Sequence, residues 1–168
     1  MTTTFIKDHT ILELTARQYA LSGIDNHQLA GEVLENIDTR KSLDNNSGLS
    51  EDSLFEPAIG SQGHKLIELV NTIAAEKKLI NKSQWGQIHR PLESTNTHHH
   101  GDSPFAWVYY VQVPPGSGDL TFWFLDRFRY SIKPQVGNLI IFPGWMNHSV
   151  SKNKGHGTRI SVSGNLGE

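Results

Sequence analysis

The feature that most constrains the fold is a series of short apolar runs, separated by turns, from Gln84 to the end of the chain. The runs are rich in β-branched and aromatic residues, which suit the pleated surface of a sheet. The segments PPGSGD (114–119) and KNKGHG (152–157) predict turns or hairpins between them. Many short strands of this kind are typical of a sandwich or jelly roll. The expected strands are WGQIHRPL, FAWVYYVQV, LTFWF, RYSI, GNLIIF, HSV and TRISVS.

Before about residue 80, apolar residues recur with the spacing of helices instead. In HQLAGEVLENID (27–38), apolar residues repeat every fourth position, and Asp25 or Asn26 can cap the start of the helix. HKLIELVNTIAAEKKLI (64–80) predicts a second helix, whose apolar stripe consists of Leu66, Leu69, Val70, Ile73 and Ile80. Both helices are expected to lie flat against a sheet.

Together these patterns predict one α+β domain that is mainly β. The chain has 168 residues, the length of a single domain. The expected architecture is a double-stranded β-helix, or jelly roll, with helical support over about residues 1–83 and the jelly-roll core over about 84–166. Between the helices, RKSLDNNSGLSEDS (40–53) is rich in Ser, Asn and Asp and predicts a loop without packed structure.

Composition excludes several classes of function. With 15 Lys and Arg against 17 Asp and Glu, the chain lacks the basic field that attracts nucleic acid or anionic membranes. It has no cysteine, so His, Asp and Glu are the strong metal ligands available. No apolar run approaches a membrane span, and MTTTFIKDHT lacks the pattern of a signal peptide. We expect a soluble protein of the cytoplasm, with no nucleic-acid or membrane partner.

Three consecutive histidines stand two residues ahead of an aspartate in THHHGDSP (97–104). Residues two apart on an extended strand share a face, with Cα atoms about 6.6 Å apart, so His98, His100 and Asp102 point one way and His99 the other. Groups at that spacing can converge on one metal ion through bonds of about 2.0–2.2 Å. A third ligand has to come from elsewhere in the chain. The alternative is a solvent-exposed histidine tract without function.

Two later stretches supply partners for this cluster. In GNLIIFPGWMNHSV, an apolar strand ends at a Pro-Gly pair and His148 follows on the next strand. In TRISVS, Arg159 and Ser161 lie two apart on one face of a strand. An arginine on the inner face of a sandwich needs an anion, and a carboxylate is its natural partner. Two histidines and one carboxylate leave coordination positions open, which suits non-heme Fe(II) chemistry with oxygen.

Over residues 97–166 the sequence resembles the 2-oxoglutarate/Fe(II)-dependent oxygenases, and most of all a phage and bacterial group related to prolyl hydroxylases. The stretches that carry the resemblance are HHHGDSPFAWVYYVQVPPGSG, GNLIIFPGWMNHSV and RISVSGNL. The resemblance implies that His100, Asp102 and His148 hold iron and that Arg159, assisted by Ser161, binds the distal carboxylate of 2-oxoglutarate.

The sequence departs from the family pattern near the first ligands. Members of this group often show His-x-His where His98 and His100 stand, so His98 competes as a ligand with the Asp102 carboxylate. The family's tyrosines in this region often touch the cosubstrate. Tyr109 and Tyr110 are adjacent on a strand, so only one can face inward, and Tyr110 is preferred. We interpret Trp107, Trp123 and Trp145 as core residues or pocket wall.

The resemblance implies a dioxygenase that couples decarboxylation of 2-oxoglutarate to succinate and CO2 with hydroxylation of a substrate C–H bond. The expected cofactors are Fe(II), 2-oxoglutarate and O2, with ascorbate as an optional addition. The expected partners are this small cosubstrate and a peptide or protein substrate, with a peptidyl proline as one candidate. The polar segment 40–53 is a candidate cover for the site, against the simpler interpretation as a disordered linker.

Two other functions compete. A cupin-type metalloenzyme without 2-oxoglutarate fits Gly137, Pro143 and His148, but it leaves Arg159 unexplained and expects a Glu where Pro104 or Phe105 stands. A non-catalytic jelly-roll binding module predicts weak iron binding and no binding of 2-oxoglutarate.

Overall fold

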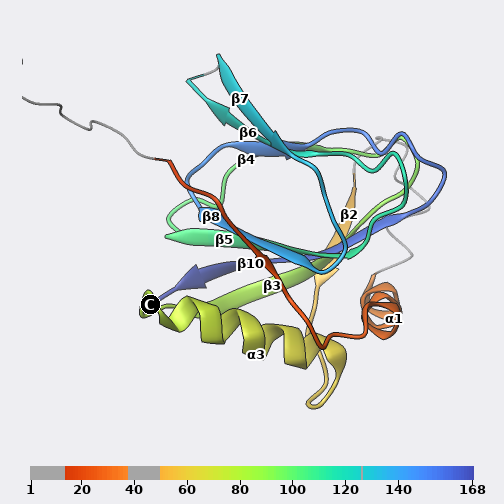
Figure 1. Ribbon diagram of the computed structural model, residues 1–168, viewed down its shortest axis with the longest axis vertical. Coiled ribbons are helices and arrows are strands. Elements are labelled where there is room, and N and C mark those ends of the chain that lie inside the picture. The colour runs from red at the N-terminus through yellow and green to blue at the C-terminus, as the bar shows by residue number, and fades with distance from the viewer. Residues whose placement is uncertain (1–13, 38–49, 126) are drawn as a thin grey trace, which may run out of the picture.

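Two antiparallel β-sheets face each other in the computed structural model, which describes residues 14–37, 50–125 and 127–168 (Figure 1). The larger sheet has the order β1-β8-β5-β10-β3-β2, and the smaller has the order β4-β9-β6-β7. The strands are β1 Arg17–Ala20, β2 Glu51–Leu54, β3 Ile80–His89, β4 Thr95–His98, β5 Phe105–Gln112, β6 Leu120–Phe124, β7 Phe128–Ile132, β8 Asn138–Pro143, β9 His148–Val150 and β10 Arg159–Gly167. The expected jelly roll is confirmed.

Two helices cover the outer face of the larger sheet (Figure 1). Helix α1 (Asn26–Asn36) begins at Asp25, whose carboxylate accepts hydrogen bonds from two backbone N–H groups of the first turn. Helix α3 (Gln62–Ala75) begins at Ser61, whose hydroxyl caps the backbone N–H of His64. The predicted second helix extended too far, because Ile80 begins β3.

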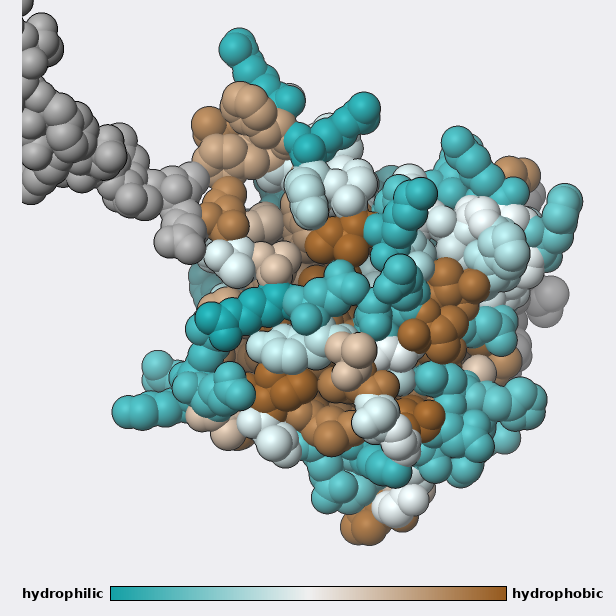
Figure 2. Space-filling view, in the orientation of Figure 1, coloured by the Kyte–Doolittle hydropathy of each residue, from teal (hydrophilic) through white to brown (hydrophobic). Residues whose placement is uncertain are grey.

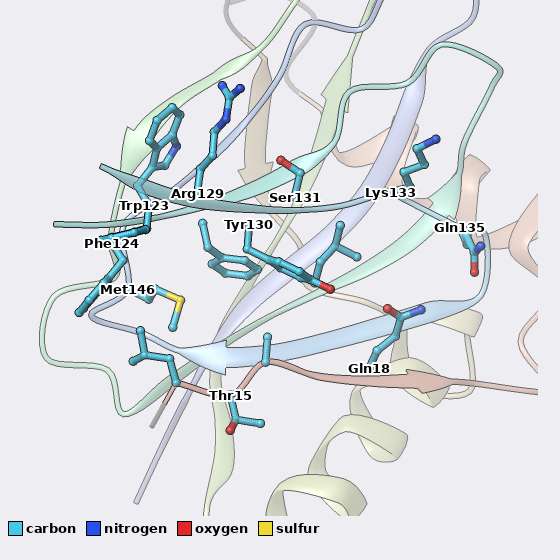
Figure 3. A pocket seen from close by; sticks show the side chains of 15 residues that line it. Thr15, Gln18, Trp123, Phe124, Arg129, Tyr130, Ser131, Lys133, Gln135 and Met146 are labelled. Carbon is cyan, nitrogen blue, oxygen red and sulfur yellow. The ribbon is translucent and has the colours of Figure 1, made fainter. Parts of the chain in front are cut away.

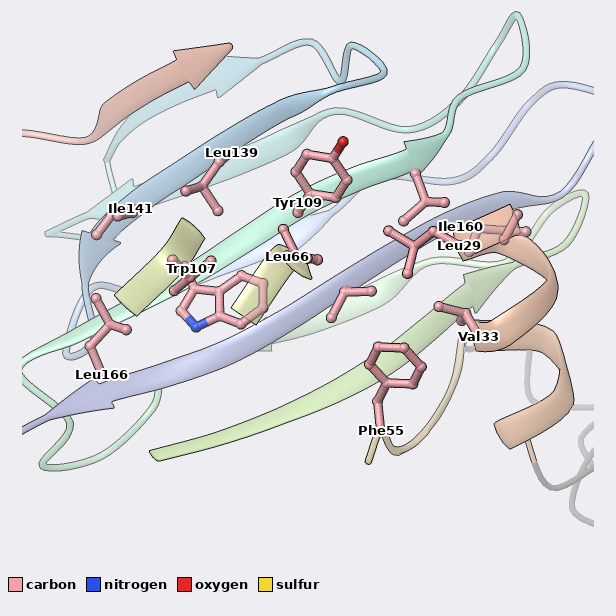
Figure 4. Close-up of a cluster of buried hydrophobic side chains, with 14 of the residues drawn as sticks. Leu29, Val33, Phe55, Leu66, Trp107, Tyr109, Leu139, Ile141, Ile160 and Leu166 are labelled. Carbon is pink, nitrogen blue, oxygen red and sulfur yellow. The ribbon is translucent and has the colours of Figure 1, made fainter. Parts of the chain in front are cut away.

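The alternation of side chains along β5 divides the core into two parts. Tyr109 belongs to the cluster between the helices and the larger sheet, together with Leu29, Leu66 and Trp107 (Figure 4). Tyr110 points the opposite way, into the cluster between the two sheets. That inner cluster also contains Ala106, Val108, Leu120, Phe122, Ile140, Phe142, Met146 and Val150. The larger sheet is therefore buried on both faces, and its inner face is where a site can form.

Strands β1 and β2 escaped the sequence prediction, because they lie in the half that was interpreted as helical support. Strand β4 runs from Thr95 into the histidine tract, which was expected to be extended, and ends at His98. Strand β2 also occupies part of the predicted loop 40–53, because Glu51–Leu54 pairs with β3. Residues 40–49 of that loop, which is also the candidate cover for the site, lie outside the described residues. Within the described ranges, no helix is both long and apolar enough to cross a membrane.

Candidate metal and anion site

Three histidine side chains converge between the sheets. His98, His100 and His148 each offer a ring nitrogen, and these atoms all lie within 4.8 Å of one another. Nε2 of His100 is 3.2 Å from Nε2 of His148. Two nitrogens bound to one metal at about 2.1 Å stand about 3.0 Å apart at a right angle and about 3.4 Å apart at a tetrahedral angle. The observed separation suits two ligands of one ion.

Strand pairing explains why these histidines meet. His98 ends β4 and is the register partner of His148, which begins β9. His100 follows two residues later, and its backbone N–H donates to the Gly144 carbonyl at 2.7 Å. The chain then turns at Gly101, where φ is +58°. Asp102 lies in that turn with an exposed side chain and is not one of the converging groups. Because the extended conformation ends at Gly101, the Asp102 side chain does not share a face with His100.

Backbone carbonyls fix the protonation of two of the rings. Nδ1 of His98 is 2.8 Å from the Asn96 carbonyl, and Nδ1 of His148 is 2.9 Å from the Met146 carbonyl. A carbonyl oxygen only accepts, so Nδ1 of each ring is the donor and Nε2 is the nitrogen left to face a metal ion. Such outer hydrogen bonds orient histidine ligands at metal sites.

Burial keeps the inner two rings neutral. It lowers the pKa of His148 to about 3, to which the nearby His98 and His100 also contribute. Burial, with His98 as the next cause, lowers the pKa of His100 to about 4. Neutral imidazole is the form that binds a metal ion, so at neutral pH these rings are ready to bind without releasing protons.

A buried guanidinium belongs to the same interior. Arg159 begins β10, is 1% exposed, and lies with its Cζ 5.2 Å from the ring centroid of Tyr110. Its Nη1 contacts Nδ1 of His89 at 2.9 Å. Burial lowers the pKa of Arg159 and raises that of Tyr110. Arg159 forms no ion pair with any carboxylate of the residues that the structure describes.

Polar atoms around this guanidinium are left without partners. Within the described part of the chain, Nε of Arg159, the Tyr110 hydroxyl and the Ser161 hydroxyl are buried without a hydrogen bond of good geometry, although Tyr110 and Arg159 lie close enough to favour each other's charged form. A buried polar group without a partner costs about 1–3 kcal/mol. Three such atoms on the neighbouring strands β5 and β10 indicate a binding site for a polar ligand. The N–H of Arg159 and the two hydroxyls can all donate hydrogen bonds, which suits a carboxylate.

The histidines and the arginine line one inner cavity of about 30 Å³. An outer cavity of about 410 Å³ adjoins it, and both are lined by Trp85, Gln87, Thr95, His98 and His100. Trp85 stacks on His100 with 5.6 Å between ring centroids, at the boundary of the two cavities. The inner space as it stands accommodates about one water molecule. A five-carbon diacid therefore requires side chains at this boundary to move.

A larger cavity of about 730 Å³ lies between the β6–β7 hairpin and the segment at β1 (Figure 3). Its lining includes Phe124, Tyr130 and Met146, whereas Trp123 and Arg129 extend from the opposite face of the hairpin in Figure 3. The tip of this hairpin forms an apolar projection in Figure 2, where Leu125 and Phe128 are exposed. Among the described residues, the buried polar atoms without partners do not line this cavity, so we place the chemistry at the histidines.

The structure brings together His100, His148, Arg159, Ser161 and Tyr110. The third converging histidine is His98, the competing candidate, and Asp102 stays apart. Trp107 is buried in the core cluster between the helices and the larger sheet, as expected. Trp145 is 51% exposed and is not a core residue. Sequence reasoning missed His89 because the pattern of WGQIHRPL predicts a strand and does not distinguish a functional histidine within it.

Comparisons with known proteins support the same family. Residues 125–165, about a quarter of the chain, match the sequence model of a family described as putative 2OG-Fe(II) oxygenase. In structure, the chain is similar to a Pseudomonas putida prolyl-4-hydroxylase at 17% identity, with a TM-score of 0.69 and coverage of 90% of this chain and 91% of the other. The chain resembles the 2OG-Fe(II) oxygenases in sequence and has their fold.

Other 2OG-Fe(II) oxygenase folds are similar as well. A Trichoplax adhaerens prolyl hydroxylase, solved with a peptide of hypoxia inducible factor, shares 12% identity, with a TM-score of 0.63 and coverage of 90% and 81% of the two chains. The α-ketoglutarate-dependent epimerase SnoN shares 16% identity, with a TM-score of 0.66 and coverage of 91% and 77%. At these identities the likeness is one of fold. None of the curated proteins compared with the chain matches it in sequence.

Proposed function

We propose that this protein is a 2-oxoglutarate-dependent Fe(II) dioxygenase in which His98, His100 and His148 hold the metal. When bound, Fe(II) and 2-oxoglutarate supply the chemistry of the family, in which O2 is activated at the cost of decarboxylating 2-oxoglutarate to succinate and CO2. The observation that carries the proposal is a single cavity lined by three converging histidines and by a buried, unpaired Arg159.

The residues present fit both groups. Imidazole is a suitable ligand for iron, and three histidines leave coordination positions open for a chelating keto acid and O2. The distal carboxylate of 2-oxoglutarate would meet Nε of Arg159 and the hydroxyls of Ser161 and Tyr110, which have no other partner among the described residues. This ligand set replaces the expected Asp102 with His98 and keeps the other expected residues.

Each side chain has a physical role in this scheme. The carbonyls that hold Nδ1 of His98 and His148 orient the two rings and keep Nε2 available. Phe142, with its ring centroid 4.7 Å from that of His148, helps to exclude water from the metal side of the cavity. Arg159 orients the cosubstrate by binding its distal carboxylate, the end of 2-oxoglutarate at which no bond is broken.

The outer cavity is the expected place for the substrate, because it shares walls with the histidines and is open to solvent. Hydroxylation of a C–H bond, with peptidyl proline as one candidate, is the finer form of the proposal. The prolyl hydroxylases among the similar folds support it. The epimerase SnoN has a similar fold and a different reaction, so the substrate has to be tested on its own.

The test is anaerobic addition of Fe(II) and 2-oxoglutarate, followed in the visible spectrum for the charge-transfer band of the chelate. O2 is then admitted and succinate is measured. We expect the band and succinate with the wild-type protein, and loss of both in His98→Ala. His99→Ala and Asp102→Ala are matched controls, because both side chains are exposed neighbours outside the converging group. Loss of the band in Asp102→Ala, with retention in His98→Ala, would restore the carboxylate as a ligand and refute the three-histidine site.

A further inference from the structure

His89 contacts Arg159 in the interior of the protein. It ends β3 and is the register partner of Arg159 on β10, so the two side chains lie next to each other on the inner face of the sheet. Both are buried, at 0% and 1% exposure. Nδ1 of His89 is 2.9 Å from Nη1 of Arg159, and Nε2 is 2.8 Å from Oγ1 of Thr95.

The guanidinium determines which nitrogen of His89 carries the proton. Arginine is a donor only, so Nδ1 of His89 accepts and the proton resides on Nε2, which donates to Thr95. Burial, with the Arg159 charge as the second cause, lowers the pKa of His89 to about 2. His89 is therefore a neutral acceptor at any working pH.

A neutral acceptor has a specific consequence for the charge of the site. A buried arginine is ordinarily paired with a carboxylate, which neutralises it. Here, within residues 14–37, 50–125 and 127–168, no carboxylate pairs with Arg159, and His89 supplies the hydrogen bond without supplying charge. The full positive charge of Arg159 remains available to an anion that enters the cavity.

The second contact of His89 extends this arrangement to the wall of the outer cavity. Thr95 Oγ1 is 2.8 Å from the Ser50 hydroxyl, and Nε2 of Gln87 lies 3.3 Å from the same Thr95 oxygen. Ser50, Gln87 and Thr95 all line the outer cavity. The imidazole is therefore held on both sides, which fixes the direction in which Arg159 presents Nε.

We propose that His89 is a positioning residue that orients Arg159 toward the distal carboxylate of 2-oxoglutarate and leaves the guanidinium charge unneutralised. This inference rests on the proposed function. The inference adds that the side chain at position 89 determines the affinity of the protein for 2-oxoglutarate. A neutral hydrogen-bond acceptor there permits tight binding, whereas a carboxylate would compete with 2-oxoglutarate for Arg159.

The test compares two isosteric substitutions. Asn and Asp both place an oxygen near the position of Nδ1, but only Asp carries charge. Binding of 2-oxoglutarate is measured by titration calorimetry on protein loaded with Mn(II), which needs no turnover. We expect His89→Asn to bind within about fivefold of wild type and His89→Asp to bind about 100-fold more weakly. Mn(II) affinity stays unchanged in both. His156→Asp is the matched control, because it makes the same change at an exposed histidine of the loop before β10.

Equal affinity of the Asp and Asn variants for 2-oxoglutarate would overturn the inference. A wild-type protein that binds Mn(II) but no 2-oxoglutarate would instead refute the proposed function. Histidine ¹⁵N NMR of the wild-type protein provides a readout that does not depend on either variant folding. We expect the His89 ring to have an unprotonated Nδ1 and a protonated Nε2. A protonated Nδ1 at His89 would contradict the proposed hydrogen bond.

Discussion

Replacing Arg159 with Met tests the site most directly, because it removes the charge and keeps much of the volume of the side chain. In the wild-type protein, Nε of Arg159 has no partner within the described residues, and Nη1 contacts His89. A carboxylate that enters the cavity gains a hydrogen bond from Nε and a second one from a neighbouring N–H of the same guanidinium.

Hydrogen bonds to charged groups contribute about 1.5–3 kcal/mol each. Two of them amount to about 3–4 kcal/mol at the lower part of that range, and about 1.4 kcal/mol corresponds to a tenfold change in affinity. Arg159→Met should therefore weaken 2-oxoglutarate binding by about 10²–10³-fold. The free energy of unfolding should change little. Removing an unpaired buried charge stabilises the protein, and leaving Nδ1 of His89 without a donor costs about 1–3 kcal/mol, so the two effects offset.

The assay is titration of 2-oxoglutarate into Mn(II)-loaded protein, with urea unfolding of the metal-free protein as the parallel measurement. The expected pair of results is a large loss of affinity with a nearly unchanged unfolding midpoint. Arg159→Met with 2-oxoglutarate affinity within tenfold of wild type would refute the assignment of Arg159 to the cosubstrate. Loss of both affinity and stability would show that the guanidinium is a structural element instead.

Three further outcomes follow from other groups. Tyr110→Phe removes a buried hydroxyl that lacks a partner among the described residues, so calorimetry should show about tenfold weaker 2-oxoglutarate binding with no loss of stability in urea. The metal-free protein should lose stability as pH falls below about 6.5. Below that value unfolded histidines bind protons, whereas His89 and His148, with pKa values lowered to about 2 and about 3, do not. Urea unfolding should give a free energy of unfolding that is about 4 kcal/mol lower at about pH 5 than at about pH 7 from these two residues, and a flat profile would contradict their burial as neutral rings. Gly164→Ala places a Cβ 2.4 Å from the Ser83 carbonyl oxygen, so thermal unfolding should show a loss of about 1–3 kcal/mol.

The sequence predicted the strands of the jelly-roll core well because their residues alternate between two buried faces or form short aromatic runs. β5 shows why this works: FAWVYYVQV sends Tyr109 to the helices and Tyr110 to the inner cavity, as alternation requires. Strands β1 and β2 were missed because they lie at the two edges of the larger sheet. Edge strands such as RQYA and EDSL are short and polar, and only pairing with a neighbour makes them strands.

The directions of the site side chains could be predicted within strands, where they alternate every second residue. They could not be predicted beyond a turn. Alternation correctly placed His98 and His100 on one side, but it continued through Asp102, where the chain turns at Gly101. The choice between His98 and Asp102 therefore depended on a backbone conformation that the period-two pattern does not describe. The contact of His89 with Arg159 joins strands that are 70 positions apart in the chain, and only the sheet register reveals it.

Charge links the two halves of the site. The described residues that line the inner cavity include no carboxylate, and burial lowers the pKa of His100, of His148 and of the adjacent His89. A divalent metal held there would keep its full charge, and Arg159 would add another at the other end. Such a cavity disfavours a neutral ligand and a cation alike, because buried charge has to be compensated. A diacid with one carboxylate for each positive centre satisfies both ends at once. If three histidines hold the metal, as proposed, no protein carboxylate shares in compensating its charge, and the doubly charged cosubstrate would supply more of that compensation.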